Sequence, residues 1–203
     1  PGDHTGMRDL IRYCEKFFLA VLAATVIVRL GPPVPEHPQL AVFLASELVG
    51  VFFILTQRKG DWATSAYATG IAFIGTCAPL LVVPTGATLA SEAVTSTLIF
   101  MGAVIAFVGK LSLRRSFGLV AANRGVKTGG LYAFVRHPIY CGYMVNHVGL
   151  LLVYASAWNV AVIGVAWMMF WLRAREEERF LLQDPEYGAY AEKVRYRLLP
   201  GLL

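Results

Sequence analysis

Long apolar runs, separated by short polar stretches, dominate the chain. A helix needs about 20 apolar residues to cross the hydrocarbon core of a bilayer. Four runs before residue 114 approach that length: Leu10–Leu30, Leu40–Thr56, Trp62–Val83 and Thr95–Leu113. The pattern therefore predicts four membrane helices in the first half of the chain.

The second half begins with a polar connector, Arg114–Thr128, and continues with an apolar stretch, Ile139–Leu172, that is too long for one ordinary span. The letters YASAWN at 154–159 divide this stretch into two runs of about 16 residues, which is short for a full crossing. We therefore predict a tight helical hairpin. Beyond it, DPEYGAYAEKV at 184–194 predicts a turn followed by a short amphipathic helix.

The composition supports a membrane protein. Of the 203 residues, 57% are hydrophobic and only 15% are charged, with a mean hydropathy of +0.58. A soluble domain of this length would carry more charge. The opening letters PGDHTG are expected to be a remnant of cloning, so residues 1–6 are left out of the fold prediction.

The net charge of +5 is explained by orientation in a membrane rather than by nucleic-acid binding, since the basic residues form no single stripe. In a six-helix arrangement with both termini in the cytoplasm, all of the 18 Lys and Arg residues except Arg29 fall on the cytoplasmic side. We therefore predict an all-α, polytopic integral membrane protein. Residues 7–113 would form four transmembrane helices, and residues 114–203 the cytoplasmic connector, the hairpin and a tail that together bind a ligand.

Neither disulfides nor a metal centre is predicted. The three cysteines, Cys14, Cys77 and Cys141, have no paired spacing, and the four histidines are equally dispersed.

Candidate chemistry is concentrated where the predicted hairpin brings its two ends together. Arg136, His137 and Tyr140 stand at the entry of the fifth helix, where Pro138 suits a first turn. The exit of the sixth carries RAREEERFLL at 173–182, so we expect the two stretches to meet.

Taken alone, each of these two stretches favours a simpler interpretation. The first resembles an interfacial helix start with a snorkelling arginine and a belt of tyrosines. The second resembles a solvated helix end in which Arg173 pairs with Glu177 and Arg175 with Glu178. Three further polar residues lie inside predicted spans. Glu47 and Lys110 are functional candidates because ionisable groups are rare there, whereas His147 suits an interhelical hydrogen bond.

Together the two stretches resemble the isoprenylcysteine carboxyl methyltransferase family and its relatives among phospholipid methyltransferases. The resemblance covers about the last third of the chain, Lys127 to Leu199, through TGGLYAFVRHPIYCGY, EEERFLL and PEYGAYAEKVRYRLLP in that order. The chain departs from the family pattern in two places. The letters DP stand at 184–185, where FG is frequent, and Arg195 stands where a proline commonly follows the valine.

The resemblance implies a membrane enzyme that uses S-adenosylmethionine, which would arrive from the cytoplasm, while a lipophilic acceptor such as an isoprenylcysteine-type carboxylate enters from the bilayer. It implies catalytic roles for Arg173, Glu177 and Arg136, with Arg173 orienting the acceptor. The implied cofactor-binding residues are Gly130, Leu131, Tyr132, Arg136, His137, Tyr140, Glu177, Glu178, Tyr187 and Tyr190.

Two other functions fit parts of the pattern. The letters VRYRLLP also resemble sterol-type membrane reductases, which would use NADPH. A non-catalytic lipid-binding membrane module would explain the helices and the loop charges, but not the paired polar stretches. The acceptor stays open between a prenylated cysteine carboxylate, a phospholipid amine and a small thiol.

Overall fold

The computed structural model describes most of the chain from residue 39 onward. The described residues are 13, 16–18, 20–25, 27–28, 39–58, 61–62, 66–118, 122–199 and 201. The predicted cloning remnant lies outside them, as do both ends of the first predicted helix. Those residues of Leu10–Leu30 that are described are helical.

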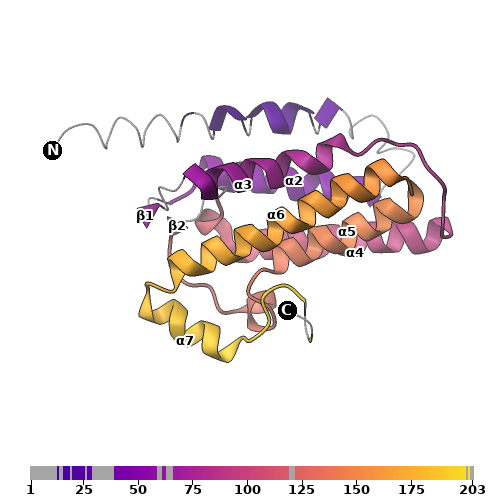
Figure 1. Ribbon diagram of the computed structural model, residues 1–203. Coiled ribbons are helices and arrows are strands. Elements are labelled where there is room, and N and C mark those ends of the chain that lie inside the picture. The colour runs from indigo at the N-terminus through magenta and orange to yellow at the C-terminus, as the bar shows by residue number, and fades with distance from the viewer. Residues whose placement is uncertain are drawn as a thin grey trace.

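The described part of the chain is helical, as predicted, apart from one pair of two-residue strands (Figure 1). Strand β1 (Asp61–Trp62) pairs antiparallel with β2 (Ala122–Asn123), which the sequence did not predict. The helices are α2 (Gln39–Leu55), α3 (Ala66–Cys77), α4 (Glu92–Leu113), α5 (Pro138–Val153), α6 (Ala157–Leu181) and α7 (Pro185–Lys193), with 3-10 turns η1 (Ala78–Leu81), η2 (Arg114–Ser116) and η3 (Gly130–Ala133).

Two boundaries differ from the sequence prediction. The run Trp62–Val83 becomes a shorter helix, α3, which gives way to the 3-10 turn η1 where Pro79 interrupts it. Helix α4 begins at Glu92, three residues earlier than expected. As predicted, helix α6 continues past Leu172 to Leu181, so the charged stretch at its end is helical.

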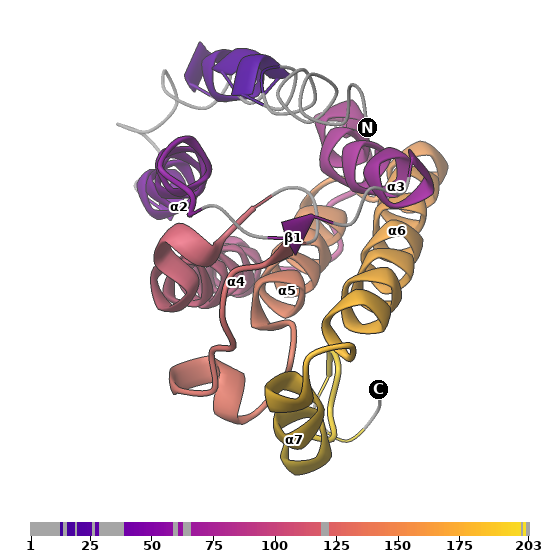
Figure 2. The same ribbon diagram turned by 90° about the vertical axis from the view of Figure 1, so that its left-hand side faces the viewer.

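The helices pack as two groups, seen nearly end-on in Figure 2. Helix α4 packs against α2 on one side and, most extensively, against α5 on the other, while α3 packs against α6. Small residues permit the close approach of α4 to α5. A Cβ atom added at Gly102 would lie 2.5 Å from the backbone nitrogen of Asn146, and one at Gly142 would lie 2.6 Å from that of Ala106. Small residues at helix contacts are typical of membrane bundles.

The hairpin of α5 and α6 turns at the predicted place but is looser than predicted. Large aromatic side chains occupy the space between its arms: the ring centroids of Tyr140 and Phe170 lie 5.3 Å apart, and those of Tyr143 and Phe170 5.9 Å apart. Helix α5 therefore makes its closest backbone contacts with α4, where glycines replace such rings. At the turn, the buried Asn159 side chain bonds to the backbone of Val83 and Tyr154.

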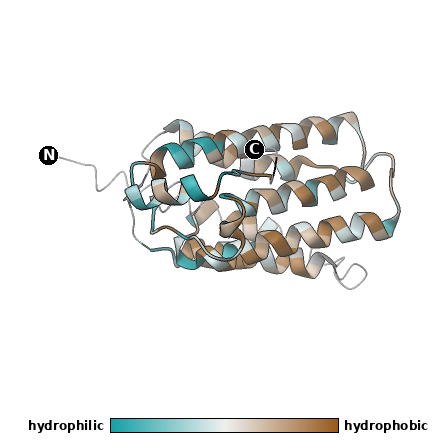
Figure 3. Ribbon diagram, turned by 90° about the horizontal axis from the view of Figure 1, so that it is seen from below, coloured by the Kyte–Doolittle hydropathy of each residue, from teal (hydrophilic) through white to brown (hydrophobic). Residues whose placement is uncertain are grey.

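Two described helices, Glu92–Ser116 and Ala157–Leu181, are long and apolar enough to cross a membrane. The apolar segments Leu44–Leu55, Tyr67–Leu81 and Pro138–Val153 are shorter. Hydrophilic residues gather at one end of the bundle, the end where Figure 1 places β1, β2 and α7 (Figure 3). Six crossings and the cytoplasmic location of both termini stay predictions.

Candidate active site at the polar end of the bundle

A cavity of about 880 Å³, counting the space at its open mouth, lies at the polar end of the bundle. The connector between α4 and α5, the start of α5, the end of α6 and α7 all contribute to its walls. The predicted site residues that line it are Tyr132, Arg136, His137, Tyr140, Arg173, Glu177, Tyr187 and Tyr190; Gly130, Leu131 and Glu178 do not.

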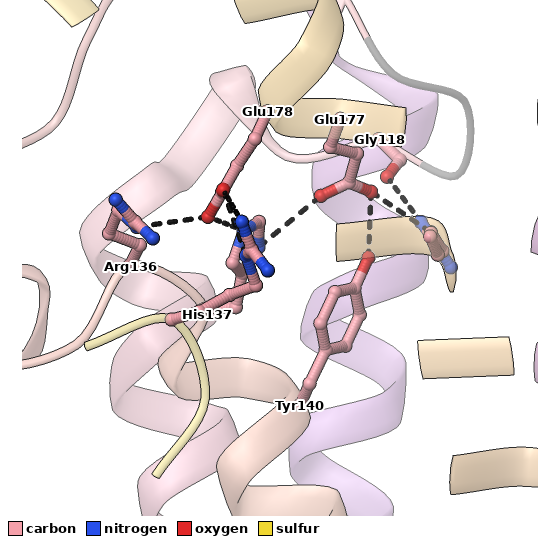
Figure 4. A network of polar contacts seen from close by, with 8 residues as sticks. Gly118, Arg136, His137, Tyr140, Glu177 and Glu178 are labelled. Atoms are coloured by element: carbon pink, nitrogen blue, oxygen red, sulfur yellow. Dashed lines mark hydrogen bonds and ion pairs between the residues drawn. The ribbon is translucent and has the colours of Figure 1, made fainter. Parts of the chain in front are cut away.

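Glu177 is the acidic centre of the cavity wall (Figure 4). Its Oε1 accepts hydrogen bonds from the Tyr140 hydroxyl at 2.7 Å and from Arg173 Nε at 3.0 Å, and its Oε2 lies 3.5 Å from His137 Nδ1. Arg173 is buried, and its Nη2 also donates to the carbonyl of Gly118 in the connector at 3.3 Å. The predicted pair of Arg173 and Glu177 is thus present, but inside the protein rather than on a solvated helix end.

Glu178 lies behind the cavity wall, with only 4% of its surface exposed. Its Oε1 is 2.9 Å from Arg136 Nε, an ion pair without hydrogen-bond geometry, and 3.1 Å from His137 Nε2. Its Oε2 is 2.7 Å from Arg197 Nη2 and 2.8 Å from Arg197 Nε. One buried carboxylate therefore joins the start of α5 to the C-terminal tail.

The two glutamates differ because of their places on helix α6. Consecutive residues point about 100° apart around a helix, since one turn takes 3.6 residues. Glu177 shares a face with Arg173, four positions earlier, and lines the cavity, while Glu178 reaches the tail. The predicted pair of Arg175 and Glu178 is absent, because Arg175 is exposed and stacks over the Trp171 ring at 4.6 Å. Beside Glu177, the glutamate that reaches the start of α5 is Glu178.

The C-terminal tail docks on the start of α5. His137 occupies the N-cap position without a capping side-chain hydrogen bond, and Pro138 follows in the first turn, as predicted. The backbone N–H groups of Arg136 and His137 donate to the carbonyls of Tyr196 and Arg197, both at 2.9 Å, so two donors at the helix start are satisfied. Leu198, only 2% exposed, packs on Tyr140, Phe170 and Ala174.

Helix α7 completes the cavity from the other side. The Tyr190 hydroxyl donates to the backbone carbonyl of Tyr132 at 2.8 Å, and the Tyr187 ring lies 5.5 Å from that of Tyr190. Asp184 caps the helix by accepting from the N–H of Glu186 at 2.9 Å, and it also accepts from Asn123 Nδ2 at 2.7 Å. Asp184, which stands where the family pattern has another residue, therefore links α7 to the connector.

Sequence reasoning missed two of these supporting residues, Arg197 and Asp184. An aspartate directly before a proline at a helix start, as at Asp184 and Pro185, is an N-cap signal. The sequence prediction placed only a turn there. Nothing in the local sequence marks Arg197 as the partner of Glu178, which lies 19 positions away.

Ionisation at the start of α5 depends on these contacts. Burial alone would lower the pKa of His137, but its contacts with Glu177 and Glu178 outweigh burial, and the pKa of the imidazole is raised above its ordinary value of 6.5. Burial raises the pKa of Tyr132 and, to about 12, that of Tyr190. At neutral pH the two phenols are therefore uncharged donors.

The raised pKa of His137 predicts a stability that declines with pH. A protonated His137 stabilises the fold fully below about pH 6.5, its ordinary unfolded value, and this contribution is lost as the pH rises through the raised pKa of the folded state. Thermal unfolding followed at a series of pH values is expected to show this fall in the wild type and a shallower one in His137→Gln. Equal slopes in the two proteins would contradict the assignment.

Comparison with known proteins gives a match to a family model and a match to a curated protein. Residues 94–183 match the model of the "Isoprenylcysteine carboxyl methyltransferase (ICMT) family". "Protein-S-isoprenylcysteine O-methyltransferase A" of Arabidopsis thaliana is 34% identical over 105 residues, covering 48% of this chain and 53% of that protein. The chain thus spans about half the length of this curated relative. The family match includes α4, α5 and α6 with both glutamates, but neither α2 nor α7.

Proposed function

We propose that this chain is a membrane methyltransferase, because residues 94–183 match the model of the isoprenylcysteine carboxyl methyltransferase family. It uses S-adenosylmethionine and acts on a lipophilic acceptor with a carboxylate, of the isoprenylcysteine type. The observation that carries the proposal is the cavity at the polar end of the matched helices, where a buried Arg173 is held between Glu177 and the connector.

The chemistry of the cavity lining fits this cofactor, which combines an adenosine with a sulfonium, an amino group and a carboxylate. Tyr132, Tyr187 and Tyr190 offer aromatic surface for the adenine, near the backbone of Gly130 and Leu131 in η3. Glu177 would accept hydrogen bonds from hydroxyl or amino groups of the cofactor. Arg136 and His137 would supply positive charge near the carboxylate of the cofactor. When bound, the cofactor supplies an electrophilic methyl group.

In this proposal Glu178 has a supporting role. Both of its oxygens are engaged by Arg136, His137 and Arg197, and it does not line the cavity. It holds Arg136 and His137 in place and keeps the tail over the start of α5.

Arg173 orients the acceptor. A guanidinium is planar and permanently charged, and it matches a carboxylate better than an ammonium does. Here the group is fixed by Glu177 Oε1 and the Gly118 carbonyl, and its Cζ lies 5.4 Å from the centre of the Tyr140 ring. Methyl transfer is a displacement that depends on alignment, so a rigid cation that fixes the attacking carboxylate contributes directly to rate.

We also propose that the polar end of the bundle faces the cytoplasm and that the helices cross the membrane six times. The gathering of hydrophilic residues at the cavity end supports this orientation (Figure 3). The water-soluble cofactor would then reach the cavity directly, while the acceptor would come from the lipid bilayer that surrounds the apolar helices.

Ligand binding and labelled-methyl transfer test the function. The purified chain in detergent is expected to gain thermal stability with S-adenosylhomocysteine but not with NADPH, and to methylate a prenylated cysteine carboxylate in preference to a phospholipid amine or a small thiol. Glu92→Gln serves as a control variant, since Glu92 is exposed in the first turn of α4, remote from the cavity residues. Stabilisation by NADPH alone would instead support a reductase.

A further inference from the structure

A second polar centre lies outside the cavity lining, between α2, α4 and α5. Lys110 of α4 is only 1% exposed, and its Nζ donates to the Ser46 carbonyl at 2.9 Å, to Ser46 Oγ at 3.1 Å and to Glu47 Oε1 at 2.8 Å. An ammonium has three N–H donors, so these three acceptors satisfy it completely. Lys110 is therefore held by α2 and is not a free cation.

Glu47, by contrast, accepts hydrogen bonds through only one of its two carboxylate oxygens among the described residues. Its Oε1 accepts from both Lys110 Nζ and the Tyr143 hydroxyl, the latter at 3.0 Å. Among the residues that the structure describes, its Oε2 has no hydrogen-bond partner, and the side chain is 23% exposed. A carboxylate oxygen at this depth in an apolar bundle is costly unless a donor reaches it, which makes it a candidate for ligand recognition.

The second centre repeats the arrangement of the first, one turn along α5. In the cavity, the Tyr140 hydroxyl donates to Glu177 and Arg173 lies over the Tyr140 ring. In the second centre the Tyr143 hydroxyl donates to Glu47, and Lys110 Nζ lies 5.1 Å from the centre of the Tyr143 ring.

The two centres adjoin one buried aromatic side chain of α6. Residues three apart on a helix are neighbours, about 5–6 Å between their Cβ atoms. Phe170 of α6 stacks with both tyrosine rings and so joins the two centres. A ligand held at Arg173 that extends past Tyr140, beyond the cavity lining, would therefore meet the second centre.

We infer that Glu47 is a specificity-determining residue for the acceptor, and that its Oε2 accepts a hydrogen bond from an N–H group adjacent to the acceptor's carboxylate. The inference rests on the proposed function and deepens it. Arg173 takes the carboxylate, and Glu47 takes the neighbouring amide N–H of an N-acylated, S-alkylated cysteine. Helix α2, which carries Glu47, lies before the family-matched region. The amide N–H would therefore be recognised by a residue outside that region.

The variant Glu47→Gln separates recognition from structure. Lys110 and Tyr143 both donate to Oε1 and hold the amide oxygen of a glutamine in that place. The amide NH₂ group then stands where Oε2 was and cannot accept a hydrogen bond. The size of the side chain and its two hydrogen bonds are unchanged, while the charge that pairs with Lys110 is lost.

The experiment compares two acceptors that differ only in the donor: N-acetyl-S-farnesylcysteine and the same farnesyl thioether carboxylate without the acetamido group. Labelled-methyl transfer by the full chain in lipid nanodiscs gives KM and kcat for each. Glu47→Gln is expected to raise KM for the first acceptor about tenfold or more, as for a lost hydrogen bond to a charged group, and to change the second less than about twofold. Tyr143→Phe keeps the ion pair between Glu47 and Lys110. It is expected to raise KM for the first acceptor about threefold and to leave KM for the second nearly unchanged. Glu92→Gln is the matched control.

Each outcome decides between the inference and the proposed function. If the wild type methylates both acceptors and Glu47→Gln raises KM equally for the two, or for neither, the inference is wrong and the proposed function stands. If the wild type methylates neither and does not bind S-adenosylhomocysteine, the proposed function fails and the inference falls with it. Stabilisation of each variant by S-adenosylhomocysteine shows that its cavity is intact, and if Glu47→Gln does not fold, Tyr143→Phe decides.

Discussion

Replacing Arg173 by Met is expected to slow methyl transfer at least about a hundredfold while S-adenosylhomocysteine still stabilises the protein. The guanidinium is buried and fixed by Glu177 and the Gly118 carbonyl, so it presents its charge in one orientation. Without it the acceptor carboxylate loses both its counter-ion and its alignment, and misplacement of a reacting group by about 1 Å alone can cost a hundredfold.

Arg173→Lys makes this prediction more specific. Lysine keeps the charge but not the planar fork that matches a carboxylate, so an intermediate loss of about tenfold is expected, mainly in kcat. The matched control is Arg175→Met on the same helix, because Arg175 is exposed and stacks on Trp171. Methyl transfer by Arg173→Met at the wild-type rate would remove the arginine from the mechanism.

The positions of the helices could be predicted because hydrocarbon thickness sets the length of an apolar run. The run Leu40–Thr56 predicts α2 to within a residue or so at each end, and the letters YASAWN mark the turn before α6. Pro138 after His137 likewise marks the start of α5. These signals are local, so one sequence is enough to read them.

Which helices pack together was not predictable in the same way. The length of an apolar run does not indicate which helix it packs against. Whether α4 or α6 is the nearest neighbour of α5 depends on where glycines and aromatic rings meet in space. Gly142 permits contact with α4, whereas Tyr140 and Tyr143 hold α6 away.

The sequence predicted which residue types form the candidate site, but it did not predict all of their contacts. Arg173 and Glu177 share one helical face, so their pair follows from spacing. The partners of Lys110 and Glu178 lie in other elements, and only the fold joins them. The long-range contacts are the ones that distinguish the supporting Glu178 from the cavity-lining Glu177.

Replacing Glu178 by Ala is expected to lower the free energy of unfolding by about 3 kcal/mol, at the low end for a broken buried ion pair because Arg197 is 30% exposed. Arg136, His137 and Arg197 would all lose their shared carboxylate. Thermal unfolding in detergent measures the loss. Glu176→Ala, two positions earlier on α6, is the matched control.

The same substitution is expected to release the C-terminal tail, since Arg197 joins it to Glu178. The contacts that remain among the described residues are mainly two backbone hydrogen bonds and the packing of Leu198 and Leu199. Trypsin should then cleave after Arg195 and Arg197 at least about tenfold faster than in the wild type, because proteolysis follows the population of the open form. Release also uncovers Tyr140, which lies under Leu198 in the cavity wall, so affinity for S-adenosylhomocysteine should fall in parallel. A cleavage rate equal to that of Glu176→Ala, together with unchanged affinity, would show that the tail is held by its apolar contacts and not by the carboxylate.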